Sequence, residues 1–352
     1  MSINSSNLIE PLKGRAAQGN LPNPFQKTNT VFDLDLYQEE TELQSSQLDT
    51  KYILSEAKSL LNRTDSGYLP FQYSANPYQG CEHGCIYCYA RPTHTYWGYG
   101  SGLDFESKII IKHNAAAVLE KELNNKKYEP GLIELSGNTD CYQPAEKEYK
   151  ITRQLLEVFL KYKHPVSIIT KNSLILRDLD LLTELHRHNL VNVCLSITSL
   201  RETTRRILEP RTASVQSRLK TLYTLVSHGI PTSVMMAPII PGINDDEIIK
   251  LVQKVSEFGA RSIHYQLVRL EGDVRTMFET WVEQNMPDKK DRIMKYLFKQ
   301  LNPNHYDSVS DPELRKMIKA QFDMACNKYL HKREHKHDFS NFKPNWKMNE
   351  LF

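Results

Sequence analysis

The chain has 352 residues, of which 25% are charged and 40% hydrophobic, and its formal net charge is +3. These are the proportions of a folded globular protein, and so small a net charge gives no overall positive field that would by itself indicate nucleic-acid binding. The first residues lack the apolar core of a signal peptide, and no run of about 18 apolar residues occurs. We therefore expect a cytoplasmic protein with no membrane partner.

Residues 1–50 are polar and broken by Pro22 and Pro24, which predicts a flexible N-terminal arm. From residue 69 onward, short apolar runs alternate with longer segments of helical periodicity. We expect helices at 145–163, near 219–229, and at 244–259, where Asn244 and Glu247 have the spacing of a capping box. The runs predicted as strands are 108–113, 131–137, 165–171, 191–199, 232–240 and 262–270.

This alternation of strands and helices predicts an α/β fold built on a parallel sheet. The pattern does not separate a full or partial barrel from an open doubly wound sheet, but both place functional residues at the carboxyl ends of the strands. After residue 271 only helices are expected, at 273–286, 288–300 and 311–330. The predicted organisation is an arm (1–50), a core domain (69–270), a C-terminal helical extension (271–330) and a solvated basic tail (331–352).

Three of the six cysteines, Cys81, Cys85 and Cys88, lie within the eight residues CEHGCIYC. Half of the cysteines in so short a stretch do not form the framework of a disulfide-stabilised protein, but they can converge on one metal centre. Zinc would need a fourth ligand, such as His83, His94 or a distant group. A cluster of four irons would keep one iron open for chemistry. The spacing leaves both possibilities open.

The stretch CEHGCIYC resembles the CxxxCxxC signature of radical S-adenosylmethionine (SAM) enzymes. Longer stretches resemble the branch that contains spore photoproduct lyase, a DNA-repair photolyase-like enzyme: GRAAQGNLPNPF, NPYQGCEHGCIYCYARPTH, TDCYQPAE, ITKNSLILRDLDLL, EPRTAS and MAPIIPGIND. The resemblance implies a partial (β/α)6 TIM-like barrel, a [4Fe-4S] cluster, SAM, and a reductase or a flavodoxin- or ferredoxin-type electron donor. It implies reductive cleavage of SAM to a 5′-deoxyadenosyl radical, which abstracts hydrogen from an unknown substrate. A nucleic-acid lesion or base is favoured over a peptide or a small metabolite.

The resemblance also implies roles for single residues. It makes Cys81, Cys85 and Cys88 the cluster ligands and sets Tyr87 near the adenine of SAM. Ten further residues are predicted to bind SAM through its methionine, ribose or adenine: Ser136, Gly137, Asn138, Thr139, Lys171, Ser196, Arg211, Ile239, Ile240 and Gly242. Cys141 is a candidate hydrogen donor, although it does not occupy the position of the donor cysteine in the lyase.

The alternative hypothesis is a zinc-stapled module that binds nucleic acid without radical chemistry. It uses the same three cysteines as a structural staple. The two hypotheses differ in colour, because a cysteine-ligated iron–sulfur cluster makes a protein brown and zinc does not.

Overall fold

The computed structural model describes residues 12–21, 23, 49–64, 70–297, 308–309, 311–330 and 336–344. Its strands are β1 (Lys51–Ser55), β2 (Leu61–Arg63), β3 (Tyr73–Ala75), β4 (Tyr78–Gln79), β5 (Lys108–Lys112), β6 (Ile133–Leu135), β7 (Val166–Thr170), β8 (Val191–Ser196), β9 (Thr232–Ile239) and β10 (Ile263–Leu267). Its α-helices are α1 (Leu103–Ser107), α2 (Ala115–Leu123), α3 (Glu146–Tyr149), α4 (Ile151–Tyr162), α5 (Leu179–Arg187), α6 (Glu202–Leu208), α7 (Val215–Ser227), α8 (Ile248–Glu257), α9 (Asp273–Asn285), α10 (Lys290–Leu297) and α11 (Pro312–Tyr329).

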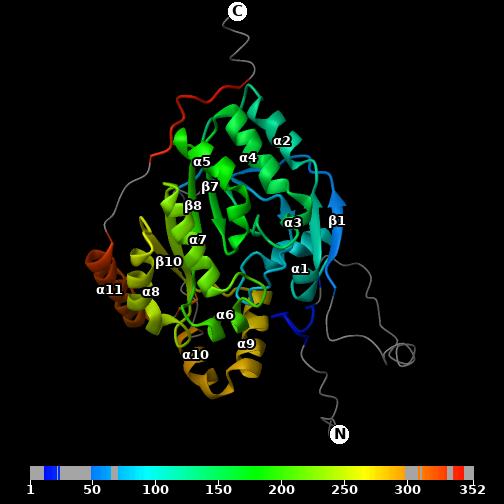
Figure 1. The fold of residues 1–352 in the computed structure, drawn as a ribbon. Coiled ribbons are helices and arrows are strands. Elements are labelled where there is room, and N and C mark those ends of the chain that lie inside the picture. The colour runs from blue at the N-terminus through cyan, green and yellow to red at the C-terminus, as the bar shows by residue number, and fades with distance from the viewer. Residues whose placement is uncertain are drawn as a thin grey trace, which may run out of the picture.

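The main sheet has seven strands in the order β10-β9-β8-β7-β6-β3-β2. All its strand pairs are parallel except the one between β2 and β3, so six parallel strands run from β3 to β10. Helices α4, α5, α7 and α8 lie along one face of this sheet (Figure 1). The α/β fold of a partial six-stranded barrel, which the sequence predicted, is confirmed.

The first strand of the predicted series is in a different place. The run 108–113 forms β5, which pairs with β1 and β4 in a separate three-stranded sheet. The first parallel strand of the main sheet is instead β3, which has only three residues and no apolar run. An apolar run predicts a buried strand, but it does not specify which sheet the strand joins.

Two predicted helices begin or break differently in the structure. The helix expected at 145–163 is divided at Lys150, whose φ of 52° is left-handed, and the carboxylate of Glu146 accepts a hydrogen bond from the amide of Thr152 at the start of α4. The capping box is wrong, because the side chain of Asn244 donates to the carbonyls of Thr198 and Pro238 and does not cap a helix. Helix α8 therefore begins at Ile248.

The helices predicted after residue 271 are found as α9, α10 and α11, with residues 298–307 outside the described part. The predicted tail is not solvated throughout, because Phe342 is buried against the ring of His164. Most of the predicted N-terminal arm lies outside the described residues, but Arg15, Ala16 and Ala17 are buried. The division of the chain into arm, core, extension and tail stays a prediction. Within the described ranges, no helix is long and apolar enough to cross a membrane.

Candidate functional site

The three clustered cysteines lie in the loop that follows β4. The amide of Cys81 donates to the carbonyl of Phe105 at 2.8 Å, and the amide of Cys88 donates to the carbonyl of Cys85 at 3.3 Å. All three thiols are free of disulfides; Cys81 and Cys85 are each 7% exposed, and Cys88 is half-buried. The loop therefore presents three unoxidised thiols on a backbone that the surrounding chain holds in place.

The electrostatics of the thiols show that they share one neighbourhood. Burial, together with the neighbouring Glu209 and Cys88, raises the pKa of the Cys85 thiol to about 12, although Lys171 acts to lower it. The pKa of Cys81 is raised by burial, by Asp140 and by both other cysteines. Binding to iron as thiolates would relieve this mutual repulsion, because a metal supplies the positive charge that buried thiolates lack.

The donor set fits an iron–sulfur cluster, because three free thiols are the ligands that such a cluster uses. In the part of the chain that the structure describes, no three His, Cys, Asp or Glu side chains surround one point as ligands of a single ion. A four-iron cluster does not require such convergence, since each cysteine binds an iron of its own.

The cysteine loop packs closely against the carboxylate of Glu106 at Gly84. Gly84 has a φ of 63°, and a Cβ there would lie 2.7 Å from Oε2 of Glu106, so only glycine lets the loop approach this closely. The carboxylate pairs with Nη2 of Arg91 at 2.5 Å and accepts the amides of Ala16 and Ala17 at 3.3 and 3.0 Å. An N-terminal segment and the cysteine loop are thus joined through one buried carboxylate.

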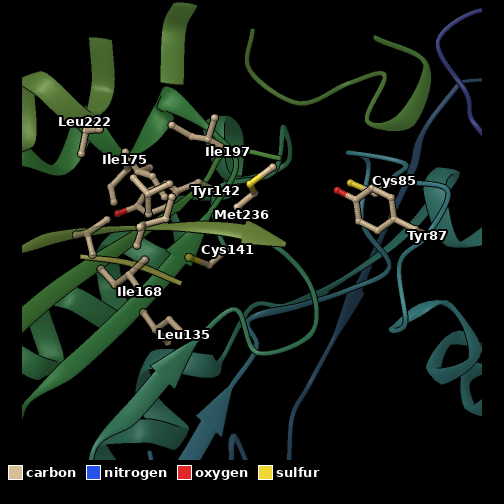
Figure 2. Packing of buried hydrophobic residues seen from close by; sticks show 14 of the residues in the cluster. Cys85, Tyr87, Leu135, Cys141, Tyr142, Ile168, Ile175, Ile197, Leu222 and Met236 are labelled. Atoms are coloured by element: carbon tan, nitrogen blue, oxygen red, sulfur yellow. The ribbon is translucent and has the colours of Figure 1, made fainter. Parts of the chain in front are cut away.

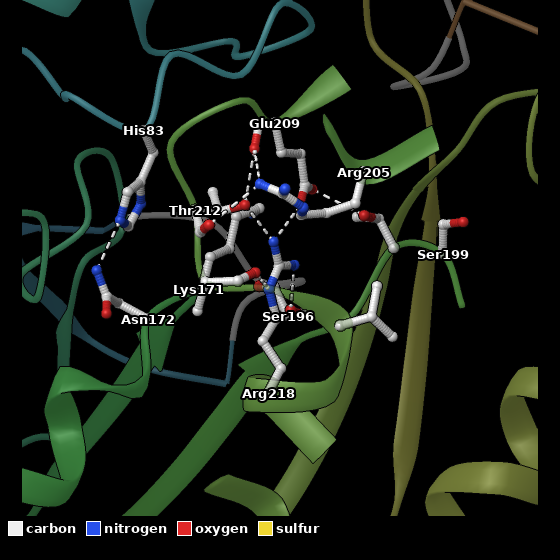
Figure 3. A network of polar contacts seen from close by, with 12 residues as sticks. His83, Lys171, Asn172, Ser196, Ser199, Arg205, Glu209, Thr212 and Arg218 are labelled. Carbon is white, nitrogen blue, oxygen red and sulfur yellow. Dashed lines mark hydrogen bonds and ion pairs between the residues drawn. The ribbon is translucent and has the colours of Figure 1, made fainter. Parts of the chain in front are cut away.

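A second buried ion pair lies beyond the loop, between Glu209 and Arg218 (Figure 3). The Glu209 carboxylate accepts hydrogen bonds from Arg218 Nη2 at 2.5 Å, from Thr198 Oγ1 at 2.8 Å and from the hydroxyl of Tyr87. Burial raises the pKa of Glu209, but Arg218 and Lys171 outweigh it and hold the value at about 2. Tyr87, predicted near the adenine, is anchored by this pair; its contact with SAM stays a prediction.

Lys171 directly follows β7 and Ser196 is the last residue of the neighbouring β8, as predicted, and both lie beside this ion pair (Figure 3). Burial lowers the pKa of Lys171, but the Cys85 thiol and Glu209 raise it more, so the side chain stays a cation close to the cysteine loop. The carbonyl of Ser196 accepts a hydrogen bond from Arg218 at 2.9 Å. The structure therefore brings Lys171 and Ser196 to the same side of the molecule as the thiols.

Asp140 was missed by the sequence reading, although it lies inside the TDCYQP stretch. Its carboxylate accepts from Thr170 Oγ1 at 2.8 Å and from the Lys171 amide at 2.7 Å, and it pairs with Nδ1 of His83 at 3.3 Å. Burial raises its pKa, but the contribution of His83 and these hydrogen bonds outweigh burial and set it at about 2. Asp140 thus ties the cysteine loop to the ends of β6 and β7. The sequence did offer a signal for this residue, because Asp140 is an acidic residue shortly after the predicted strand 131–137.

The predicted 136–139 stretch forms the turn directly after β6. Ser136 has a left-handed φ of 75°. The amides of Asn138 and Thr139 both donate to Oδ1 of Asn76, at 2.9 and 3.3 Å. The carbonyl of Gly137 accepts the hydroxyl of Tyr89, the residue that follows the last cluster cysteine. This strand end is therefore held directly against the cysteine loop, as binding of one ligand by both would require.

Four of the predicted SAM-binding residues have structural roles of their own. The guanidinium of Arg211 pairs with Glu82 at 3.3 Å and donates to Thr50 at 3.4 Å. Ile239 and Ile240 are fully buried in the main core, and Gly242 has the left-handed φ of 83° that a turn requires. Their contact with SAM stays a prediction.

Cys141 lies apart from Cys85 and Tyr87, in the segment that joins β6 to α3 (Figure 2). It is fully buried in the cluster that contains Leu135 and Ile168 of the sheet and Leu222 of α7 (Figure 2). Its carbonyl accepts the hydroxyl of Thr152 in α4 at 2.6 Å. The thiol therefore packs between the sheet and its helices, where burial raises its pKa. Its role as hydrogen donor stays a prediction that this packing does not favour.

Comparisons with known proteins agree with this geometry. The family model of the radical SAM superfamily matches residues 75–255. An uncharacterised protein of Mycobacterium tuberculosis is 33% identical over 234 residues, which are 66% of this chain and 69% of that protein. One of Methanocaldococcus jannaschii is 31% identical over 222 residues, 63% of this chain and 79% of that protein.

Two further similarities concern proteins with named activities. A radical SAM Nalpha-GlyT isomerase of a Pseudomonas phage is 26% identical over 195 residues, which are 54% of this chain and 38% of that protein. A structure of spore photoproduct lyase complexed with dinucleoside spore photoproduct is 17% identical, with a TM-score of 0.58 over 79% of each chain. A mutant of the same lyase with bound AdoMet has a TM-score of 0.59, 16% identity and the same coverage of 79% of each chain. The family match spans more than half of this chain, and the protein therefore belongs to the radical SAM superfamily.

Proposed function

We propose that this radical SAM enzyme acts on a base of a nucleic acid, at a lesion or at a modified base. The observation that carries the proposal is the shared fold with spore photoproduct lyase, which has been solved with a dinucleoside bound. The phage relative, a radical SAM Nalpha-GlyT isomerase, shares the superfamily of this chain. A lyase-type or repair reaction on DNA is the finer form of this proposal.

The cofactors follow from the family, which uses a [4Fe-4S] cluster and SAM. Cys81, Cys85 and Cys88 would hold the cluster. When bound and reduced, the cluster supplies the electron that cleaves SAM to methionine and a 5′-deoxyadenosyl radical. We propose a reductase or a flavodoxin- or ferredoxin-type protein as the electron donor.

The protein's own residues hold SAM and keep water away. The ammonium of Lys171, held charged beside the Glu209 carboxylate, would neutralise the methionine carboxylate. The buried Glu209–Arg218 pair fixes Tyr87 and the carbonyl end of β8 before any ligand arrives. Burial of Cys81 and Cys85 limits water at the place where a radical is made.

The test is anaerobic release of 5′-deoxyadenosine. The reconstituted protein is reduced with dithionite, given SAM, and assayed with irradiated DNA, with the same DNA before irradiation, and without DNA. We expect release in all three, with the largest amount in the presence of one of the DNAs. Release that no DNA changes would overturn the substrate class. Colourless protein with stoichiometric zinc and no release would instead favour the zinc-stapled module.

A further prediction concerns Cys141. Because Cys141 is fully buried and bonded to Thr152 of α4, replacement by alanine is expected to leave 5′-deoxyadenosine release unchanged and to lower stability by about 1 kcal/mol. In the folded protein, mass spectrometry after alkylation should find Cys141 unmodified, whereas the unfolded chain should be labelled. Rapid labelling of native Cys141 would show that the thiol reaches an open site and would restore it as a hydrogen donor.

A further inference from the structure

Four polar residues lie side by side across the middle of the apolar sheet. In the strand register, Ser74 of β3 is opposite Glu134 of β6, Glu134 is opposite Ser167 of β7, and Ser167 is opposite Asn192 of β8. We call these four residues the polar row. The neighbouring level of the same strands is apolar, with Leu135, Ile168 and Val193 opposite one another, so the four polar side chains mark a face of different character. The polar row therefore requires an explanation other than packing.

The polar row faces away from the helices. Successive side chains of a strand point to opposite faces, so Glu134 points opposite to Leu135, which packs in the core with Ile168 (Figure 2). Strand β9 shows that this second face is not fully covered. There Ser233 and Met235 are partly exposed, whereas Val234 between them is buried. The polar row thus lines the inner, concave side of the partial barrel.

Within the polar row, the carboxyl group of Glu134 lacks part of its hydrogen bonding. Glu134 is 4% exposed, and Oε1 has no hydrogen-bond partner among the residues that the structure describes. The same holds for Oδ1 of Asn192, two strands away. Leaving a buried polar group without a partner costs about 1–3 kcal/mol, so such groups are rare unless something else binds them. Two of them on one row point to a ligand.

The surroundings of Glu134 favour the protonated form of its carboxyl group. Burial raises its pKa to about 8, and a hydrogen bond from Ser167 opposes this only in part. Two ionisable groups lie close enough for a charge on Glu134 to raise their pKa: Tyr89 of the cysteine loop and Cys194 of β8. Arg269, which follows β10, lowers the pKa of Tyr89. A protonated carboxyl group offers one donor and one acceptor side by side. It therefore matches a partner that presents one acceptor and one donor in the same arrangement.

We infer that the polar row, with Glu134 at its centre, binds the hydrogen-bonding edge of a nucleobase. This rests on the proposed function and names the part of the substrate that the barrel reads. A base edge presents a donor next to an acceptor on one side of a planar ring, so both can bond one carboxyl group. A peptide group cannot do this, because its N–H and C=O point in opposite directions in the trans form. The bonding pattern of the row therefore selects a base over a peptide.

The experiment measures binding of a thymidine dinucleotide to the anaerobically reconstituted full chain in the presence of SAM, by equilibrium dialysis. Glu134→Ala is expected to weaken binding about 10-fold or more, the loss that accompanies an unpaired hydrogen-bonding group. Glu134→Gln is expected to bind nearly as the wild type, because an amide also carries one donor and one acceptor. The matched control is Gln266→Ala, on β10 and exposed, which is expected to leave binding unchanged.

A ligand control separates edge recognition from stacking. The dinucleotide methylated at N3 of both bases has lost its donor and is expected to bind at least about 10-fold more weakly to the wild type. A peptide methylamide is expected not to compete. Equal binding by the wild type and Glu134→Ala, equal binding of the methylated dinucleotide, or no binding of the dinucleotide at all would each overturn the inference. Release of 5′-deoxyadenosine in the same wild-type samples reports on the radical SAM activity separately.

Discussion

Replacing Cys85 by alanine is expected to abolish both the iron content and the release of 5′-deoxyadenosine. Loss of a residue that only supports a metal ligand commonly costs 10- to 100-fold, so loss of a ligand itself should exceed about 100-fold. Cys85 is 7% exposed, and the charge interactions of its thiol place it near Cys88 and Lys171. Iron per chain, the brown colour and the yield of 5′-deoxyadenosine are the three measurements.

The fold of this variant should remain. Cys85 lies in a loop, and the hydrogen bonds that hold this loop, such as that from the Ile86 amide to the Leu208 carbonyl, are made by the backbone. The circular dichroism spectrum is therefore expected to match that of the wild type. Cys326→Ala, in α11, is the matched control, since it also removes a buried thiol but lies far along the chain from the loop. An unfolded Cys85→Ala protein would show that the loop is structural, and a variant that keeps its iron would exclude Cys85 as a ligand.

How much of the molecule the sequence predicts depends on how local the signal is. Each of the five strands from β6 to β10 falls inside a run that the sequence predicted as a strand, and the cysteine loop is a motif eight residues long, so both could be identified directly. Strand β3 could not, because it has three residues and is defined by its pairing with β6. The place of β5 in the second sheet depends likewise on partners that are distant in the sequence.

The candidate site follows the same rule. Its thiols, the 136–139 strand end and Lys171 were found because each follows a strand or belongs to a motif. The carboxylates that position them were not. Glu106 reaches Arg91 and Ala17 across 15 and 89 residues, and nothing in a linear sequence links such a triplet. The capping box at Asn244 failed for the opposite reason: its spacing is correct, but tertiary partners at Thr198 and Pro238 take the side chain.

Replacing Glu106 by alanine is expected to destabilise the protein by about 3–5 kcal/mol, the cost of leaving a buried charge without its partner. Both Arg91 and Glu106 are fully buried, and their side chains meet at 2.5 Å. The variant would leave the guanidinium of Arg91 with only carbonyl acceptors, at Cys85, Ser101 and Gly102. The cysteine loop would also lose the carboxylate against which Gly84 packs. Iron content should fall together with stability.

A surface ion pair supplies the matched control. Arg63 and Glu129 approach to 3.2 Å, but their side chains are 66% and 73% exposed, so Glu129→Ala should cost less than about 1 kcal/mol. Midpoints of urea unfolding and iron per chain are measured for both variants under anaerobic conditions. Equal midpoints would show that the buried pair contributes no more than the surface pair.

The Glu106→Gln variant separates charge from geometry. Its amide oxygen can still accept the amide of Ala17 or a bond from Arg91, but it no longer balances the charge of Arg91. If the charge is what matters, this variant should resemble Glu106→Ala in stability. If the hydrogen bonds to the N-terminal segment are what position the loop, it should retain most of its iron. The carboxylate does both in the wild type, and for that reason an N-terminal segment far from the thiols in the sequence can control how they are presented.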